Sequence, residues 1–119
     1  MIYIQSNVKD ESLVEKRRQQ ILQASIRLFR EKGFHRATTR EIAQTAGFSI
    51  GTLYDYVRTK EDVLYLISDR IFHKVSEVFE QFSNEKVTVK QLKIAIKQYI
   101  ELVDLMHDEF TIMYQETKS

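Results

Sequence analysis

Apolar residues recur along the N-terminal part of the chain at intervals of three, four and seven, the spacing that places side chains on one face of an α-helix. This pattern predicts a first helix from Val14 to Lys32, followed by Gly33 where a left-handed C-cap belongs. No alternating strand pattern is longer than a few residues, and the chain contains no proline. The predicted fold class is therefore all-α.

The C-terminal half repeats the helical pattern. A cap at Thr59 begins a long helix that extends to about Phe82, and a polar loop follows at residues 83–87. Thr88 caps another helix, and after a break at 107–108 one more helical segment begins.

Two short helices are predicted between the long ones. Thr38 and Glu41 fit a capping box, which begins a helix that ends near Ala46. Residues 47–49, Gly-Phe-Ser, then form a turn in which glycine supplies a positive φ and serine caps the helix of residues 50–57. Two short helices joined by a tight turn and braced by a longer helix form a helix-turn-helix, whose second helix lies in the DNA major groove.

Composition narrows the class of protein. The 119 residues are 43% hydrophobic and 29% charged, which suits one compact domain or a small domain plus part of another. The absence of cysteine excludes disulfides, thiolate metal sites and thiol nucleophiles. We find neither a signal peptide nor a transmembrane segment, so a cytoplasmic location and no membrane partner are expected.

Charge is distributed unevenly although the net charge is only +1. Residues Val14 to Lys60 include ten basic and four acidic residues, whereas Glu61 to Ser119 include seven basic and eleven acidic residues. This asymmetry suggests that the first half faces a polyanion, and the alternative is a solvated basic face.

Gly51 lies inside the second short helix, where glycine costs up to ~1 kcal/mol relative to alanine. A helix without a side chain at this point approaches a base edge or a phosphate more closely. The alternative is close packing of helix against helix.

The pattern TTREIAQTAGFSIGTLYDYVRTKEDVL, preceded by ILQASIRLFREKGF, closely resembles the N-terminal DNA-binding domain of the TetR family of transcriptional regulators. The match spans about residues 14–74, with the threonine pair, I-A-x-x-A-G, G-T-L-Y and Lys-Glu at the family's spacing. Phe48 replaces a residue that is usually a smaller aliphatic, and Val57 stands where phenylalanine is frequent. The resemblance implies a three-helix bundle with a helix-turn-helix at about 38–57, then a long linking helix and, in residues 75–119, part of a C-terminal effector-binding and dimerisation domain.

The resemblance also selects the candidate DNA-binding residues, to which chemistry assigns roles. Threonine hydroxyls and backbone N–H groups suit phosphates, and an arginine suits guanine as a bidentate donor, the alternative for that arginine being a phosphate or solvent contact. An isoleucine suits a thymine methyl, tyrosines suit phosphates, and the lysine resembles the family's phosphate-binding lysine. The candidates are Thr38, Thr39, Arg40, Ser49, Ile50, Gly51, Thr52, Tyr54, Tyr56 and Lys60.

Two questions about residues in this region stay open at the level of sequence. Tyr54 and Tyr56 both suit phosphates, but one of them can instead belong mainly to the core. Asp55 carries a charge that phosphate repels, so it either accepts from cytosine N4 or turns toward Arg58 or Thr59.

In TetR relatives the C-terminal helices enclose an effector pocket and pair with a second subunit. Only the first of them are expected here, so the chain resembles a fragment or an unusually short member. A candidate ligand-facing set, with ordinary core or exposed truncated core as the alternative, is Tyr99, Val103, Met106, Phe110 and Met113.

No catalytic machinery, cofactor loop or metal site is predicted, because the histidines are scattered, adjacent carboxylates diverge on a helix and three glycines cannot build a phosphate-binding loop. The function expected is a transcriptional repressor, not an enzyme, that binds a palindromic double-stranded operator as a homodimer and is released by a small molecule. Hydrophobic effectors such as acyl-CoA are common in the family. The alternative is a helical ligand-binding or protein-interaction module without DNA binding.

Overall fold

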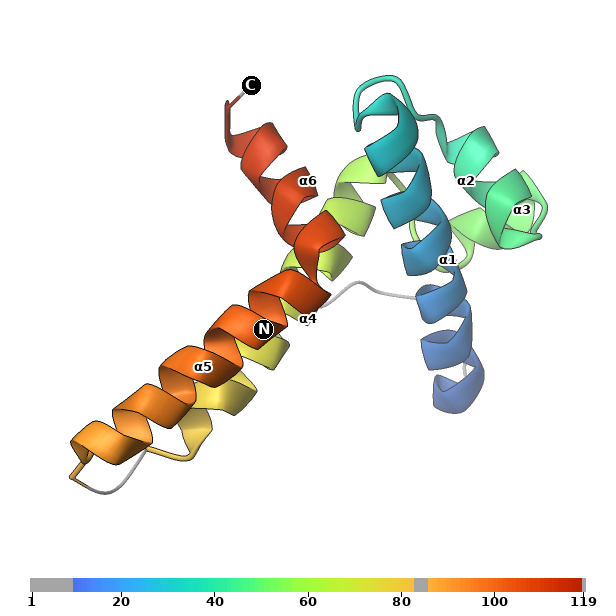
Figure 1. Ribbon diagram of the computed structural model, residues 1–119. Coiled ribbons are helices and arrows are strands. Elements are labelled where there is room, and N and C mark those ends of the chain that lie inside the picture. Colours follow the sequence, from blue (N-terminus) through green and yellow to red (C-terminus); the bar gives the residue numbers. More distant parts are fainter. Residues whose placement is uncertain (1–9, 83–85, 119) are drawn as a thin grey trace.

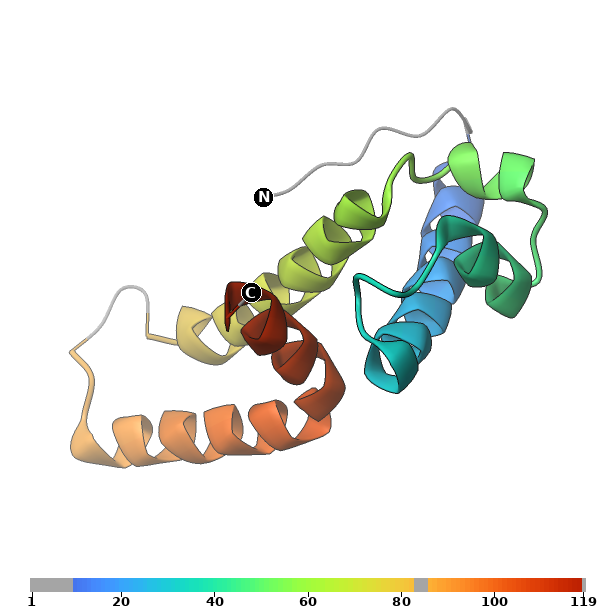
Figure 2. The same ribbon diagram turned by 90° about the horizontal axis from the view of Figure 1, so that it is seen from above.

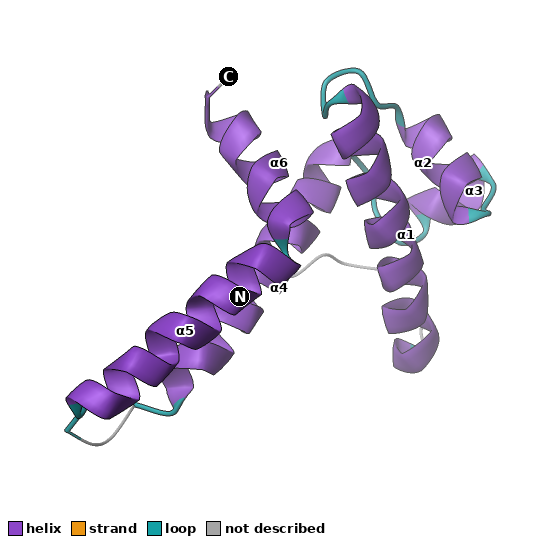
Figure 3. Cartoon of the chain, in the orientation of Figure 1, coloured by secondary structure: helices purple, strands orange, loops and turns teal. Residues whose placement is uncertain are grey.

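In the computed structural model, which describes residues 10–82 and 86–118, the described chain forms six α-helices and no strand (Figures 1 and 3). The all-α prediction is therefore confirmed for these residues. Part of the predicted loop at 83–87 lies outside the described residues. The helices are α1 (Glu11–Lys32), α2 (Thr39–Ala46), α3 (Ile50–Tyr54), α4 (Lys60–Glu80), α5 (Val89–Leu105) and α6 (His107–Lys118).

The helices form two groups that share α4. α1, α2 and α3 cluster at one end of the molecule, and α5 lies along α4 at the other end (Figures 1 and 2). α6 crosses back and packs on both α1 and α4. Because α4 contacts α1, α5 and α6, it joins the helix-turn-helix to the C-terminal helices.

The main apolar core lies within the N-terminal group. Phe29, Ile21, Ile42 and Leu53 are almost completely buried there, and α6 adds Ile112 at 2% exposure. Burial of side chains of this size stabilises by about 1.5–3 kcal/mol each. The three-helix unit is thus closed on one side by a helix from the C-terminal part of the chain.

Side-chain caps begin the helices that the pattern predicted. Complete capping boxes are present at Thr38 with Glu41, at Thr59 with Asp62 and at Thr88 with Gln91. The Ser49 hydroxyl accepts from the Thr52 N–H at 3.1 Å, as expected for the start of α3. These boundaries are confirmed because they depend on residues only three positions apart.

Three boundaries differ from the prediction. α1 begins at Glu11, since the Asp10 carboxylate accepts from the backbone N–H groups of Ser12 and Leu13. α3 ends at Tyr54 and not at Val57, because the chain tightens there into a turn. The break between α5 and α6 falls at a single residue, Met106, before the predicted position.

Both glycines that follow helices have positive φ, but they differ in ψ. Gly47 has φ 86° and ψ 24°, which is the left-handed conformation, and the Phe48 N–H bonds the Ala43 carbonyl across it. Gly33 has φ 84° and ψ 156°, so the predicted left-handed conformation is wrong at this residue. Its φ and ψ belong to a region that is essentially restricted to glycine, because a Cβ there collides with the residue's own backbone.

The C-terminal helices expose many apolar side chains. Leu105 is 83% exposed, Val89 70% and Ile100 61%, and α5 buries only Ala95. Within the described residues no helix combines the length and the apolar character needed to cross a bilayer. α5 is therefore an amphipathic helix with an exposed apolar face.

The two positive-φ glycines give a paired stability prediction. Gly33→Asn is expected to destabilise the protein by about 1–3 kcal/mol, because asparagine does not adopt its backbone conformation without strain. Gly47→Asn is expected to cost less than about 1 kcal/mol, because asparagine tolerates the left-handed region. Urea unfolding followed by circular dichroism measures both, and equal costs would contradict the assignment of the two conformations.

The capping box of α2 gives a pH prediction. Hydrogen bonds from Lys32 and from the Thr38 backbone hold the pKa of Glu41 below its ordinary value of 4.5. A lowered pKa in the folded state stabilises the protein above pH 4.5, and this stabilisation disappears as the pH falls through the folded-state pKa. We expect Glu41→Gln to lower the melting temperature at neutral pH, with a gap to the unaltered chain that closes below pH 4.5.

The matched control is Glu31→Gln, which removes the same charge from α1 outside the capping box. Thermal unfolding of the three proteins across pH 3–7 makes the comparison. A gap of the same size and pH dependence for both variants would contradict a specific role of the box.

Candidate nucleic-acid interface

The helix-turn-helix places the start of α2 beside the end of α3. The Thr39 hydroxyl and the Tyr54 hydroxyl lie 3.2 Å apart and share a hydrogen bond. Tyr54 is 45% exposed, whereas Leu53, its neighbour on α3, is completely buried. α3 therefore presents one face to the core and the opposite face to solvent at the edge of the molecule (Figure 1).

Gly51 lies on this exposed face. A Cβ built on Gly51 would have only the Ser49 Oγ near it, at 4.0 Å. Its φ is not positive, so neither backbone conformation nor contact with another helix in the described chain requires glycine there. Close packing of helix against helix, the alternative left open by the sequence, is excluded within the described chain.

Arg40 is exposed in the first turn of α2. Its guanidinium has no hydrogen bond or ion pair with any residue in the described part of the chain. Five N–H donors are thus available on a side chain near the N-terminal end of α2. This geometry is compatible with a base contact and with a phosphate contact.

The candidate hydroxyls already have partners within the helix starts. The Thr38 hydroxyl accepts from the Glu41 N–H and donates to the Glu41 carboxylate, both at 3.1 Å. The Ser49 and Thr52 hydroxyls are 2.9 Å apart. A phosphate oxygen needs a donor, so the Thr38 and Ser49 hydroxyls must exchange partners to bind one, whereas the Thr52 hydroxyl accepts from Ser49 and does not use its own O–H in that bond.

Tyr56 and Ile50 face inward. Tyr56 is 4% exposed and stacks on Phe48, with ring centroids 6.4 Å apart, so it is the tyrosine that belongs mainly to the core. Ile50 is half-buried and packs against the same core. Tyr54 is therefore the phosphate candidate of the two, and Asp55 is exposed just beyond the end of α3.

Lys60 is hydrogen-bonded to the segment that connects α1 with α2. Its Nζ donates to the Phe34 carbonyl at 2.9 Å and to the His35 carbonyl at 3.3 Å. The same ammonium lies 4.6 Å from the centre of the Phe34 ring. Two of the three ammonium N–H groups are thus used, so a phosphate contact by Lys60 takes the third or replaces one of these bonds.

One contact at this surface was not predicted from the sequence. The Arg17 guanidinium of α1 lies over the Phe48 ring, 5.0 Å from its centroid. Phe48 belongs to the turn that precedes α3. No local pattern relates residues so far apart, and the unusual aromatic at position 48 is the only sequence signal for the contact.

The clefts found in the described part of the chain do not bring the five candidate ligand-facing residues together. A cleft of about 610 Å³ lies between α4, α5 and α6, and Met106 is the one member of the set that lines it. Tyr99 packs on Phe79 at 6.2 Å, and Met113 packs against the N-terminal core. The assignment of these residues to an effector pocket stays a prediction.

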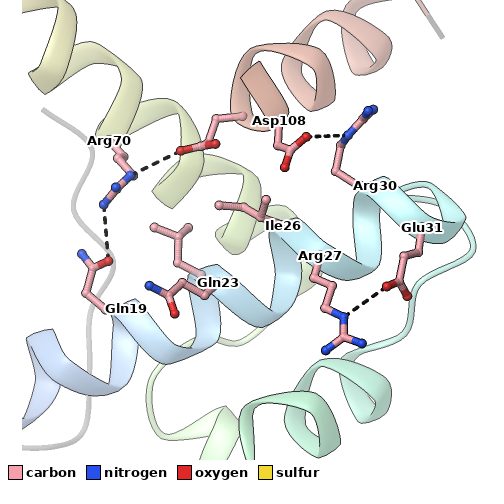
Figure 4. A pocket seen from close by; sticks show the side chains of 10 residues that line it. Gln19, Gln23, Ile26, Arg27, Arg30, Glu31, Arg70 and Asp108 are labelled. Atoms are coloured by element: carbon pink, nitrogen blue, oxygen red, sulfur yellow. Dashed lines mark hydrogen bonds and ion pairs between the residues drawn. The ribbon is translucent and has the colours of Figure 1, made fainter. Parts of the chain in front are cut away.

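A second cleft, of about 460 Å³, lies where α1, α4 and α6 meet (Figure 4). Two ion pairs cross it: Arg30 Nε to the Asp108 carboxylate at 2.9 Å, and Arg70 Nε to Glu109 at 3.5 Å. Arg70 also reaches Gln19 of α1 at 3.4 Å. The Arg30–Asp108 pair is partly exposed and contributes about 0–1 kcal/mol, so it orients α6 on α1 more than it stabilises the fold, while Arg70–Glu109 joins α6 to α4.

Metal-binding geometry is not found in the described part of the chain, where no group of three His, Asp or Glu side chains converges. His73, for example, is bonded through Nδ1 to the Asp69 carbonyl of its own helix at 2.8 Å.

Comparison with known proteins agrees with this geometry. Residues 21–65 match the family described as bacterial regulatory proteins, tetR family. The HTH-type transcriptional regulator HbdR of Aromatoleum sp. (strain CIB) is 34% identical over 117 residues, which are 98% of this chain and 51% of that protein. The fatty acid metabolism regulator protein of Bacillus subtilis (strain 168) is 32% identical over 85 residues, 71% of this chain and 44% of that protein.

Solved structures give the same result. The fatty acid degradation regulator FadR from Bacillus halodurans aligns with a TM-score of 0.66 and 29% identity, over 78% of this chain and 50% of that one. FadR from Thermus thermophilus, a TetR family transcriptional repressor in complex with lauroyl-CoA, aligns with a TM-score of 0.53 and 30% identity, over 83% and 52%. The chain thus spans about half the length of these relatives. With the helix-turn-helix geometry described above, these matches assign the chain to the TetR family of bacterial regulatory proteins.

Proposed function

We propose that this chain is the DNA-binding part of a transcriptional repressor that recognises a palindromic operator as a homodimer and is released by a small hydrophobic effector. The protein acts by binding and not by catalysis, in the cytoplasm, where its DNA lies. The proposal rests on the chain's membership of the TetR family and on one observation above all. The face of α3 around Gly51 is exposed and carries no side chain at its centre.

The arrangement of charge supports a nucleic-acid partner. Residues 14–60, which contain most of α1 and all of α2 and α3, hold a clear excess of basic side chains, whereas residues 61–119 hold an excess of acidic ones. Arg40, Tyr54 and Gly51 lie on the two helices that a helix-turn-helix brings to the major groove. Arg40 supplies the bidentate donors that guanine accepts, and Tyr54 supplies a phenolic O–H for phosphate.

A homodimer gives the operator its symmetry. Two recognition helices reach successive major grooves when they are about 34–36 Å apart, or a multiple of this distance. A change in that separation weakens both half-sites together, because each helix then misses its groove. The homodimer in this proposal places one helix-turn-helix on each half-site.

The contacts of α6 support a route from effector to DNA. α6 is ion-paired with α1 through Asp108 and with α4 through Glu109, and Ile112 is inserted in the core beside them. An effector that displaces α6 therefore moves α1 and α4, and with them the recognition helix. The acyl-CoA bound by the Thermus relative makes a hydrophobic acyl ligand the first class to test.

The role of Arg40 is tested by selecting bound duplexes from random DNA and measuring affinity by gel shift. If Arg40 reads guanine, Arg40→Ala relaxes the preference at one position per half-site by about 1–3 kcal/mol and leaves the salt dependence unchanged. Arg40→Lys keeps the charge but loses the planar pair of donors, so the preference relaxes here too.

A phosphate contact by Arg40 predicts the opposite pattern. Arg40→Ala would then make the log–log salt slope less steep by about 0.9 and weaken all sequences equally. Binding of the unaltered chain that does not depend on salt would contradict the proposed function and favour a module without DNA binding.

Gly51 gives a second functional prediction. Gly51→Ala is expected to leave the fold intact and to stabilise it by about 0.4–1 kcal/mol, because alanine restricts the unfolded chain and no neighbour opposes its methyl group. DNA affinity is expected to fall roughly tenfold, about 1.4 kcal/mol, because the methyl group occupies the surface that meets the groove.

Urea unfolding and gel shift on the same preparation separate the two effects. Thr45→Ala on α2, whose side chain lines a shallow cleft against α1, is the matched control for a small substitution in this unit. An alanine at 51 that leaves affinity at the level of this control would contradict the role of the bare backbone.

A further inference from the structure

Arg17 differs in its contacts from Arg27 and Arg30 of the same helix. Arg27 is paired with Glu31 at 3.1 Å, and Arg30 with Asp108 at 2.9 Å. The Arg17 guanidinium is half-buried over the Phe48 ring, and within the described residues it makes no hydrogen bond or ion pair. Arg17 is therefore held in place by a ring while its N–H donors stay available for a ligand.

The ring that holds Arg17 is itself fixed. Phe48 stacks on the buried Tyr56 at an interplanar angle of 26°, and its backbone N–H bonds the Ala43 carbonyl at 2.8 Å. Tyr56 belongs to the core of the three-helix unit. Arg17, Phe48 and Tyr56 thus form a stack that extends from the core to the surface, and its outer member is a cation.

The position of this stack relates it to the recognition helix. Phe48 is the residue immediately before Ser49, the N-cap of α3. A guanidinium stacked on Phe48 therefore lies beside the end of α3 that follows the turn, whereas Thr39 and Tyr54 lie at the opposite end of the helix. A helix in the major groove runs between two phosphate backbones, so a group at the Phe48 end is placed to contact a different backbone from Thr39 and Tyr54.

We propose that Arg17 of α1 binds a phosphate of the operator backbone beside the Phe48 end of the recognition helix, and that Phe48 is the residue that positions it. This inference rests on the proposed function, and it adds a contact from α1 to the candidates of α2 and α3. A guanidinium that lies over a ring can still direct the N–H donors at its edge toward phosphate oxygens. A lysine lacks this planar orientation.

The test compares Arg17→Gln with Arg27→Gln, which removes the same charge from the same helix away from Phe48. Affinity for the duplex recovered by selection is measured by gel shift between 50 and 200 mM salt. Loss of one phosphate contact makes the slope less steep by about 0.9. The affinity ratio of unaltered chain to Arg17→Gln is then expected to fall roughly threefold to fourfold across this range. Arg27→Gln is expected to keep the original slope.

Variants at position 48 test the positioning role. Phe48→Leu stays apolar but removes the ring, and it is expected to change the slope in the same direction as Arg17→Gln. Phe48→Tyr retains the ring and is expected to keep the slope of the unaltered chain. The double variant Arg17→Gln with Phe48→Leu is expected to show no further change in slope.

The outcomes separate this inference from the proposed function. Equal slopes for Arg17→Gln and Arg27→Gln, in proteins with unchanged circular dichroism, would overturn the phosphate contact while DNA binding itself stands. A lower thermal stability of Phe48→Leu with an unchanged slope would reduce the stack to a structural contact and overturn the positioning role. Failure of the unaltered chain to bind DNA would overturn the proposed function, and this inference with it.

Discussion

The first four backbone N–H groups of an α-helix have no carbonyl partner within the helix. Because α3 has only five residues, most of its backbone N–H groups are in this position. A helix of this length does not form alone in water. Ser49 satisfies one of its donors, and Leu53 anchors the helix in the core at 0% exposure. The candidate DNA-reading surface thus depends on a cap at one end and a single buried leucine at the other.

The same requirement governs the rest of the chain. Aspartate, threonine and serine side chains stand before α1 to α5, and three of them form complete capping boxes. Each cap contributes about 1 kcal/mol, which matters in a protein whose core is confined largely to one end. The helix starts are therefore defined locally, while tertiary packing decides how the helices are oriented.

This division explains what the sequence predicted. The order of the helices, the caps of α2 to α5 and the turn at Gly47 depend on residues within about four positions, and they were predicted; the Asp10 cap of α1 was not. The shorter α3 was not, because its end is decided by the burial of Tyr56 and Val57. Contacts across the fold were missed as well: Lys60 reaches a carbonyl 26 positions away, and Arg30 reaches Asp108 across 78 positions. Of the candidate site, Arg40, Gly51 and Tyr54 are exposed and Tyr56 is buried, and the contact of Arg17 with Phe48 is apparent only in the fold.

The attachment of Lys60 has a consequence for how the helix-turn-helix moves. Through this side chain the first residue of α4 is joined to the segment that leads into α2, and Phe34 in that segment packs edge-on against Phe29 of α1 at 5.2 Å. A tilt of α4 is therefore transmitted to the segment that leads into α2 and, through Phe34, to α1. Under the proposed function, this attachment gives a regulatory signal in α4 a direct mechanical route to the helix-turn-helix.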